Sequence, residues 1–92
     1  MPRVSVLMPC RDAAAWLNEA IASLEAQTFA DYEVVAVDDA STDETPSLLH
    51  AWARRDPRVR VFSGPGRGVA AALAAGLAHA RGEIVARMDA DD

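Results

Sequence analysis

Short apolar runs alternate with amphipathic stretches along the whole chain. Four of the runs are apolar along their length and partly β-branched, which is typical of buried strands. These runs lie at residues 3–8, 32–39, 58–63 and 83–89. Between them, apolar residues recur every three to four positions, and this spacing predicts three helices. The pattern therefore predicts the element order β-α-β-α-β-α-β.

The ends of the three predicted helices carry local signals. We expect the helices at residues 13–27, at 69–80 and, between these two, up to about residue 54. Asp12 suits the N-cap of the first helix. The second helix starts either at the capping-box spacing of Ser41 and Glu44 or at the competing Thr45-Pro46. Gly82 suits the C-cap of the third helix.

Strands of this kind, separated by helices, imply a parallel sheet covered on both faces. Right-handed crossovers make it a Rossmann-like, doubly wound α/β layer, for which we expect the strand order 3-2-1-4. In such sheets, ligands bind beyond the carboxyl ends of the strands, where the strand order reverses. The motifs PCRD (9–12), DDAS (38–41) and DADD (89–92) follow the first, second and fourth strands. With this order the three motifs should face one crevice.

The acidic stretch DADD is the strongest chemical signal. Asp89 and Asp91 are two positions apart, so in an extended segment their side chains point the same way. Mg²⁺ and Mn²⁺ prefer oxygen ligands and often bind one or two carboxylates together with substrate phosphates. A solvated strand end is the structural alternative for a lone DxD. The DADD stretch is expected beside the PCRD and DDAS motifs at the ends of two other strands. This position favours a metal site of Asp91, Asp89 and Asp92.

The DDAS motif and the glycine-rich stretch at 64–68 leave more alternatives open. Asp38 and Asp39 can accept hydrogen bonds from a base N–H or a ribose hydroxyl. Alternatively, Asp39 caps the following helix and Asp38 is solvated. The stretch GPGRG at 64–68 lacks GxxxxGK[ST], and Val69 takes the last glycine position of GxGxxG. It predicts a turn, with Arg67 solvated rather than bound to an anion.

Several conspicuous side chains have structural interpretations. Cys10 is expected to be a small buried residue, because neither a nearby His nor a helix start marks it as a nucleophile. His50 and His79 fall on predicted helices without metal-ligand spacing, so we expect them at the surface. Trp16 and Trp52 fit the packing faces of helices.

Composition limits the partners and the compartment. The 92 residues, 51% of them apolar, suit one small domain or part of a larger one. The net charge of −5 argues against a nucleic-acid partner. A single cysteine fits a reducing compartment, and no apolar stretch reaches the roughly 18–20 residues of a membrane span. We expect a cytoplasmic location, with a longer parent protein able to associate with the inner face of the membrane.

Three segments closely resemble the beginning of the family 2 glycosyltransferases, which have the GT-A fold. They are VSVLMPCRDAAAWLNEAIASLEAQTF, YEVVAVDDASTDET and ARGEIVARMDADD. The resemblance implies a nucleotide-diphospho-sugar donor, with a UDP-sugar favoured. It places Pro9 and Arg11 beside the base and Asp39 at the base edge, with Asp38 supporting that site. Many relatives have Tyr-Asn where this chain has Arg11-Asp12, so the aromatic residue that would stack on the base is absent here.

The same resemblance implies the roles of the acidic stretch. It places Asp89 near the ribose and diphosphate and Asp91 near a divalent metal, Mg²⁺ or Mn²⁺, with Asp92 sharing the metal. Many relatives also have Asn where Ala74 stands, which removes a polar contact.

The resemblance further implies sugar transfer, usually with inversion, to a saccharide, lipid or polysaccharide acceptor. The general base of the family lies after the DxD motif, so we expect it beyond residue 92 and interpret residues 1–92 as the donor-binding portion, without the acceptor half. The alternative is a nucleotide-binding or structural fragment without turnover. We also expect the fourth strand to leave an exposed sheet edge, which favours self-association.

Overall fold

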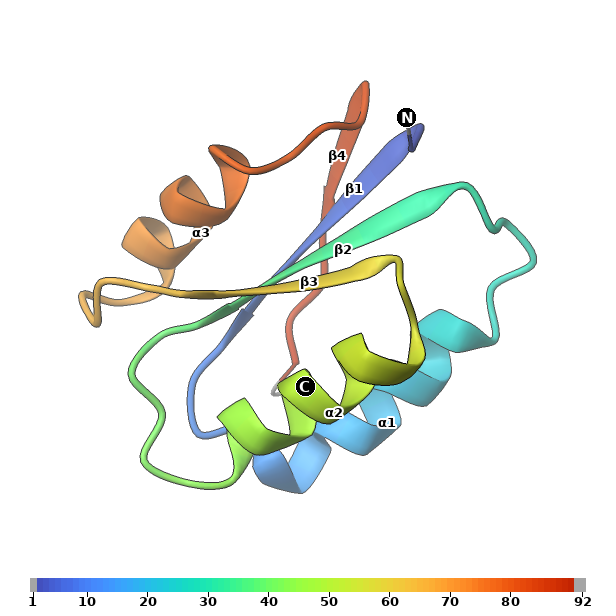
Figure 1. Ribbon diagram of the computed structural model, residues 1–92. Coiled ribbons are helices and arrows are strands. Elements are labelled where there is room, and N and C mark those ends of the chain that lie inside the picture. The colour runs from blue at the N-terminus through green and yellow to red at the C-terminus, as the bar shows by residue number, and fades with distance from the viewer. Residues whose placement is uncertain (1, 91–92) are drawn as a thin grey trace.

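The computed structural model, which describes residues 2–90, confirms the predicted order of elements. The elements are β1 (Val4–Cys10), α1 (Ala14–Glu25), β2 (Tyr32–Asp38), α2 (Thr45–Arg55), β3 (Val59–Ser63), α3 (Val69–Leu77) and β4 (Ile84–Arg87). All pairings are parallel, in the order β3-β2-β1-β4 that we expected. Figure 1 shows α1 and α2 together on one face of the sheet and α3 on the other. The fold is therefore a doubly wound α/β layer.

Strand β1 continues two residues beyond its predicted end at residue 8. Pro9 pairs with Val37 although it has no N–H to donate. The Leu7 carbonyl accepts from the Met88 N–H at 2.9 Å, and the β1–β4 pairing ends at Leu7. Residues two apart direct their backbone groups to the same side. The missing N–H of Pro9 therefore lies on the side where pairing has already stopped, which is where a strand tolerates proline.

The sheet separates two apolar cores. Along β2, Val34 and Ala36 belong to the larger core under α1 and α2, whereas Val35 and Val37 belong to the smaller core under α3. This alternation follows from the two-residue period of a strand. The second helix contributes Trp52, which is completely buried, as its helical spacing predicted.

The expectation for Trp16 is wrong, since 44% of this residue is exposed. The buried stripe of α1 consists of Leu17, Ala20, Ile21 and Leu24. Trp16 precedes Leu17 by one position, which turns its side chain by about 100° around the helix axis. The residue consequently lies beside the buried stripe and not within it.

The predicted N-cap of α1 is also wrong. The helix follows Ala13, whose N–H donates to the Thr45 hydroxyl at 2.9 Å, while the Ala14 N–H donates to Asp43 at 3.2 Å. Asp12 instead accepts from the Thr42 N–H at 2.6 Å. The unpaired N–H groups at the start of a helix need acceptors, and here the acceptors lie about thirty residues later, just before α2 and at its first residue.

The second helix begins at Thr45, with Pro46 in its first turn, so the competing start is correct. The capping box of Ser41 and Glu44 does not form. Glu44 occupies the N-cap position without a side-chain bond, and the Ser41 hydroxyl accepts from the Asp12 N–H at 3.0 Å.

Gly82 serves the sheet and not the end of α3. That helix ends at Leu77 with Ala78 as its C-cap. The Gly82 N–H donates to the Ser5 hydroxyl at 2.8 Å, and a Cβ at Gly82 would lie 2.8 Å from the Ser5 backbone nitrogen. A larger residue would collide with β1, so this position requires glycine for close approach.

A buried carboxylate holds the same connection against the sheet. Glu33 accepts hydrogen bonds from the Ser5 hydroxyl at 2.6 Å, from Arg60 Nη1 at 2.8 Å and from the Arg81 N–H at 2.7 Å. Burial of Glu33 raises its pKa, but the hydrogen bonds from Ser5, Arg81 and Arg60 outweigh burial and lower the pKa from 4.5 to about 2. A charged, fully bonded Glu33 therefore joins β1, β2, β3 and the segment before β4.

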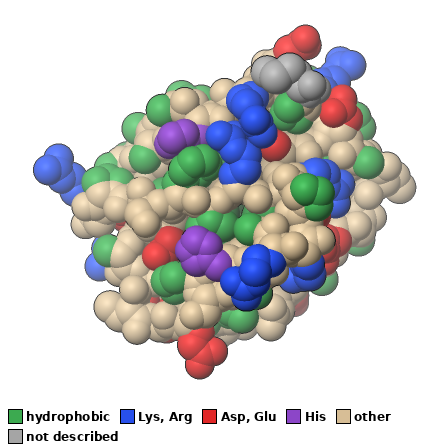
Figure 2. Space-filling model, viewed as in Figure 1, with side chains coloured by type: hydrophobic (Ala, Val, Ile, Leu, Met, Phe, Trp, Pro, Cys, Tyr) green, Lys and Arg blue, Asp and Glu red, His purple; other side chains and the backbone are tan. Residues whose placement is uncertain are grey.

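The fourth strand and the two histidines lie at the surface. Strand β4 pairs with β1 alone among the described strands, and all four of its residues are exposed. His50 and His79 are exposed as expected, but His79 lies beyond α3 and stacks on Phe62 at 3.8 Å. Histidines lie among basic and apolar side chains on the face seen in Figure 2.

None of the described helices has the length and hydropathy of a membrane span.

Candidate functional site

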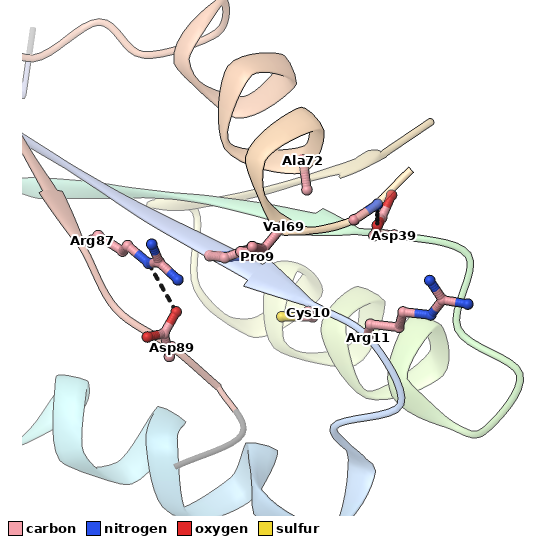
Figure 3. Close-up of a pocket in the computed structure, with 9 residues that line it drawn as sticks. Pro9, Cys10, Arg11, Asp39, Val69, Ala72, Arg87 and Asp89 are labelled. Carbon is pink, nitrogen blue, oxygen red and sulfur yellow. Dashed lines mark hydrogen bonds and ion pairs between the residues drawn. The ribbon is translucent and has the colours of Figure 1, made fainter. Parts of the chain in front are cut away.

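A cavity of about 380 Å³ opens at the carboxyl ends of β1 and β4, where the strand order reverses. Its lining comes from Pro9, Cys10, Arg11, Asp39, Gly68, Val69, Ala72, Arg87 and Asp89 (Figure 3). Residues from all three strand-end motifs thus meet at one place. In open parallel sheets this is where ligands bind. Cys10 forms part of the wall and is otherwise buried, as predicted.

Asp39 is buried and holds the cavity wall. Only 3% of the residue is exposed, and its carboxylate accepts from the N–H groups of Gly66 at 2.6 Å and Gly68 at 3.0 Å. It is therefore neither solvated nor a cap of α2. Because Gly68 is the N-cap position of α3, the carboxylate instead lies at the start of that helix. A carboxylate has about four acceptor positions, so Asp39 keeps capacity for a ligand.

The GPGRG stretch is a turn, as predicted, and its backbone closes around the Asp39 carboxylate. Gly66 and Gly68 have φ angles of 73° and 102°, which side-chain-bearing residues rarely adopt. A Cβ at Gly64 would lie 2.8 Å from Asp39 Oδ1. The glycines therefore let the loop close on the carboxylate, and Gly68 and Val69 become part of the cavity wall.

Asp38 and Asp39 differ in their position relative to the cavity, which only Asp39 lines. Asp38 does not line the cavity, and its Oδ1 is buried without a hydrogen-bond partner among the described residues. Its backbone carbonyl accepts from the Gly64 N–H at 2.8 Å. The link from Asp38 to the cavity wall therefore runs through its backbone.

Arg11 and the pair of Arg87 and Asp89 mark different parts of the cavity. Figure 3 shows Arg11 on the side of Asp39, with Arg87 and Asp89 beyond Pro9. Arg11 is exposed, and no hydrogen bond to its guanidinium occurs among the described residues. It is available to a ligand at the Asp39 side.

Asp89 forms an ion pair that sequence reasoning missed. Arg87 Nε lies 2.9 Å from Asp89 Oδ1, with side-chain exposures of 49% and 34%. The two residues are two positions apart in an extended segment, and this spacing was the available signal.

The described residues carry only part of the expected metal site. They contain no group of three or more His, Cys, Asp or Glu side chains suited to a metal ion. Asp91 and Asp92, which we assigned to the metal, lie outside the described residues. Asp89 borders the cavity and keeps its second carboxylate oxygen, Oδ2, clear of the bond to Arg87. Such an oxygen fits Mg²⁺ or Mn²⁺, which often use one or two carboxylates.

The chain is similar to bacterial glycosyltransferases along its whole length. It is 36% identical to an uncharacterized glycosyltransferase of Haemophilus influenzae, covering 100% of this chain and 37% of that protein. It is 34% identical to a chondroitin synthase of Pasteurella multocida, covering 100% of this chain and 10% of that protein. The chain therefore spans between about a tenth and about a third of the length of these two relatives.

Two solved structures share the fold at substantial identity. The mannosyltransferase PcManGT of Pyrobaculum calidifontis, in complex with GDP-Man and Mn²⁺, has a TM-score of 0.89 and 40% identity, covering 98% of this chain and 28% of that chain. S. aureus TarS 1-349, in complex with UDP-GlcNAc, has a TM-score of 0.82 and 30% identity, covering 97% and 26%. The family model described as glycosyl transferase family 2 matches residues 5–92. On this evidence the chain belongs to glycosyl transferase family 2, with a GT-A, Rossmann-like fold.

Proposed function

We propose that this chain binds the nucleotide-diphospho-sugar donor of a glycosyltransferase in the cavity at the ends of β1 and β4. The observation that carries the proposal is the meeting of Arg11, Asp39 and Asp89 around one cavity at the reversal of strand order. An elongated anionic ligand with a planar base at one end suits such a cavity. The GDP-Man and UDP-GlcNAc complexes of the two structural neighbours support this class of donor.

The nucleoside end is assigned to the side of Arg11 and Asp39. A guanidinium can stack on a planar ring, and Arg11 is exposed there. Asp39 offers acceptor capacity toward a base N–H, and its position is held by the Gly66 and Gly68 amides. Pro9 forms the wall between this side and Asp89. We favour a UDP-sugar as the donor.

The diphosphate end is assigned to Asp89, together with Asp91 and Asp92. These carboxylates would hold Mg²⁺ or Mn²⁺, and the Mn²⁺ in the structural neighbour supports a divalent ion. A bound cation neutralises charge on the departing nucleoside diphosphate. Asp89 would lie near the ribose and the diphosphate. The acceptor would displace the nucleoside diphosphate with inversion at the anomeric carbon. Saccharides, lipids and polysaccharides are the proposed acceptors.

Titration calorimetry with a panel of nucleoside diphosphates tests the proposal. Wild-type protein should bind at least one of them with Mn²⁺ present and much more weakly in EDTA. Asp91→Ala should remove most of the metal-dependent affinity. Glu19→Ala is the matched control, because Glu19 is an exposed carboxylate on α1 away from the cavity. Equal binding with Mn²⁺ and with EDTA would refute the metal role, and no binding at all would refute the function.

Sugar transfer requires a separate assay. Transfer needs a general base, in this family a carboxylate, that takes the acceptor proton, and such a base contributes about 10²–10⁴-fold in rate. The two described carboxylates at the cavity, Asp39 and Asp89, are both assigned to the donor: Asp39 to the base edge and Asp89 to the diphosphate end. We therefore expect the 92-residue polypeptide to bind nucleotide without transferring sugar. Robust transfer to generic acceptors would contradict this expectation and make Asp92 the first candidate for the base.

A further inference from the structure

Arg87 is the one basic residue at the Asp89 side of the cavity among those that line it. It is the last residue of β4 and pairs with Leu7 of β1. Leu7 belongs to the core on the α3 face of the sheet. Paired residues in neighbouring strands face the same side, so Arg87 is directed to that face, as is Asp89 two positions later. Figure 3 shows both side chains at the cavity.

The contact to Asp89 uses only part of the guanidinium. Arg87 donates through Nε to Asp89 Oδ1 at 2.9 Å, and this is its one side-chain hydrogen bond among the described residues. An arginine has five N–H donors in a fixed fork, so four donors on the two Nη groups remain. Nearly half of the side chain is exposed. Exposed ion pairs contribute little to stability, which indicates that structural support is not the main use of this arginine.

The distribution of charge around the cavity indicates a ligand for these donors. If the nucleoside lies beside Arg11 and Asp39, the phosphates lie toward Asp89, where like charges would repel. The Nη groups of Arg87 lie at this side of the cavity and are free to donate. A guanidinium binds phosphate oxygens in a bidentate manner.

We propose that Arg87 has two roles in the donor site: its Nε positions the Asp89 carboxylate, and its Nη groups bind the diphosphate of a nucleoside diphosphate. The inference rests on the proposed function, since it requires a nucleotide in this cavity. In the ligand-bound arrangement, Asp89 Oδ1 stays on Arg87 and Oδ2 remains open to a cation. Arg87 then neutralises part of the diphosphate charge independently of the metal.

The test compares a nucleoside diphosphate with its nucleoside in the same calorimetric titration. Arg87→Gln removes the positive charge, and Arg87→Lys keeps the charge but removes the fork. Arg54→Gln is the matched control, because Arg54 is an exposed arginine on α2 remote from the cavity lining. Circular dichroism and urea unfolding of each variant establish that the fold is intact.

We expect Arg87→Gln to weaken diphosphate binding by about tenfold or more, which is the range of a hydrogen bond to a charged group. The affinity for the nucleoside should stay within about twofold, and the weakening should persist in EDTA. Arg87→Lys should fall between wild type and Arg87→Gln. A structural role would instead lower the affinities for both ligands together.

Three results would overturn the inference in distinguishable ways. If wild type binds the diphosphate and Arg87→Gln binds it equally well, Arg87 is a surface ion pair and the proposed function stands. If Arg87→Gln loses affinity for both ligands equally, Arg87 supports the site without binding the diphosphate, and the proposed function again stands. If wild type binds neither ligand, the proposed function fails and this inference fails with it.

Discussion

Asp39 is a charged residue that is almost completely buried, and its bonds explain why. A buried carboxylate is costly unless it is hydrogen-bonded, and Asp39 accepts from the Gly66 and Gly68 amides. Hydrogen bonds to charged groups contribute about 1.5–3 kcal/mol each. The position of the loop at 64–68, and with it one wall of the cavity, therefore depends on this single side chain.

We expect Asp39→Asn to lower the free energy of unfolding by about 1–3 kcal/mol. The substituted amide keeps one acceptor oxygen but turns an NH₂ group toward a backbone N–H. Urea unfolding measures the change. Asp31→Asn is the control, because Asp31 is exposed and its side chain makes no hydrogen bond among the described residues. Equal effects of the two substitutions would show that the loop does not depend on the Asp39 carboxylate.

Arg11 offers a contrasting prediction at the same scale, because its contribution should appear only with ligand. It is exposed at the cavity and supports no described neighbour. Base stacking contributes roughly 1–3 kcal/mol per base, so Arg11→Ala should weaken nucleotide affinity by at most about 100-fold. The midpoint of urea unfolding should not change. Unchanged affinity in calorimetry would make Arg11 a solvated surface residue.

At the scale of elements, Glu33 joins three strands to the segment that leads from α3 into β4. Ser5 of β1, Arg60 of β3 and Arg81 all donate to it. A buried carboxylate that satisfies several donors is strongly destabilising to lose, because the donors are left without partners. The bond set therefore holds the segment that enters β4 against the sheet.

The low pKa of Glu33 predicts acid sensitivity. Its folded pKa of about 2 lies below the ordinary 4.5, so its ionised form stabilises the folded state above about pH 4.5. This stabilisation, on the order of 3 kcal/mol at most, is lost as the pH falls from about 4.5 toward 2. Urea unfolding at pH 7, 4 and 3 should show a steeper loss in wild type than in Glu33→Gln. Parallel losses would refute the assignment.

At the scale of the whole molecule, β4 is an unprotected edge of the described sheet. Its residues are exposed, including Ile84 at 48% and Val85 at 44%. An exposed apolar edge strand presents unpaired N–H and C=O groups and is a site of strand-to-strand association. The apolar groove of about 330 Å³ beside Phe29, Tyr32 and Met88 extends this surface.

We therefore expect concentration-dependent self-association of the 92-residue polypeptide in sedimentation velocity. Val85→Lys should shift the distribution toward monomer, because a lysine on an edge opposes pairing. Leu77→Lys is the control, since Leu77 is 54% exposed but lies at the end of α3. A purely monomeric wild type, or equal effects of both substitutions, would refute association through the edge.

The order of elements, the parallel sheet and the family could be predicted from the sequence alone. The strands and helices follow from apolar periodicity, which is a local property of neighbouring residues. The strand-end motifs also indicated the cavity side, because parallel strands share one carboxyl edge. Pro9, Arg11, Asp39 and Asp89 were predicted at the site, and the structure brings all four to one cavity.

The contacts between distant residues could be decided only by the tertiary structure. Thr45 and Asp43 cap α1 from about thirty positions away, so a local cap at Asp12 was the wrong prediction. Asp39 binds a loop 27 to 29 positions later, a contact that the turn signal of GPGRG could not indicate. Local patterns carry no information on which loops pack together. That choice is made when the two faces of the sheet are covered, and it placed Asp39 at the start of α3.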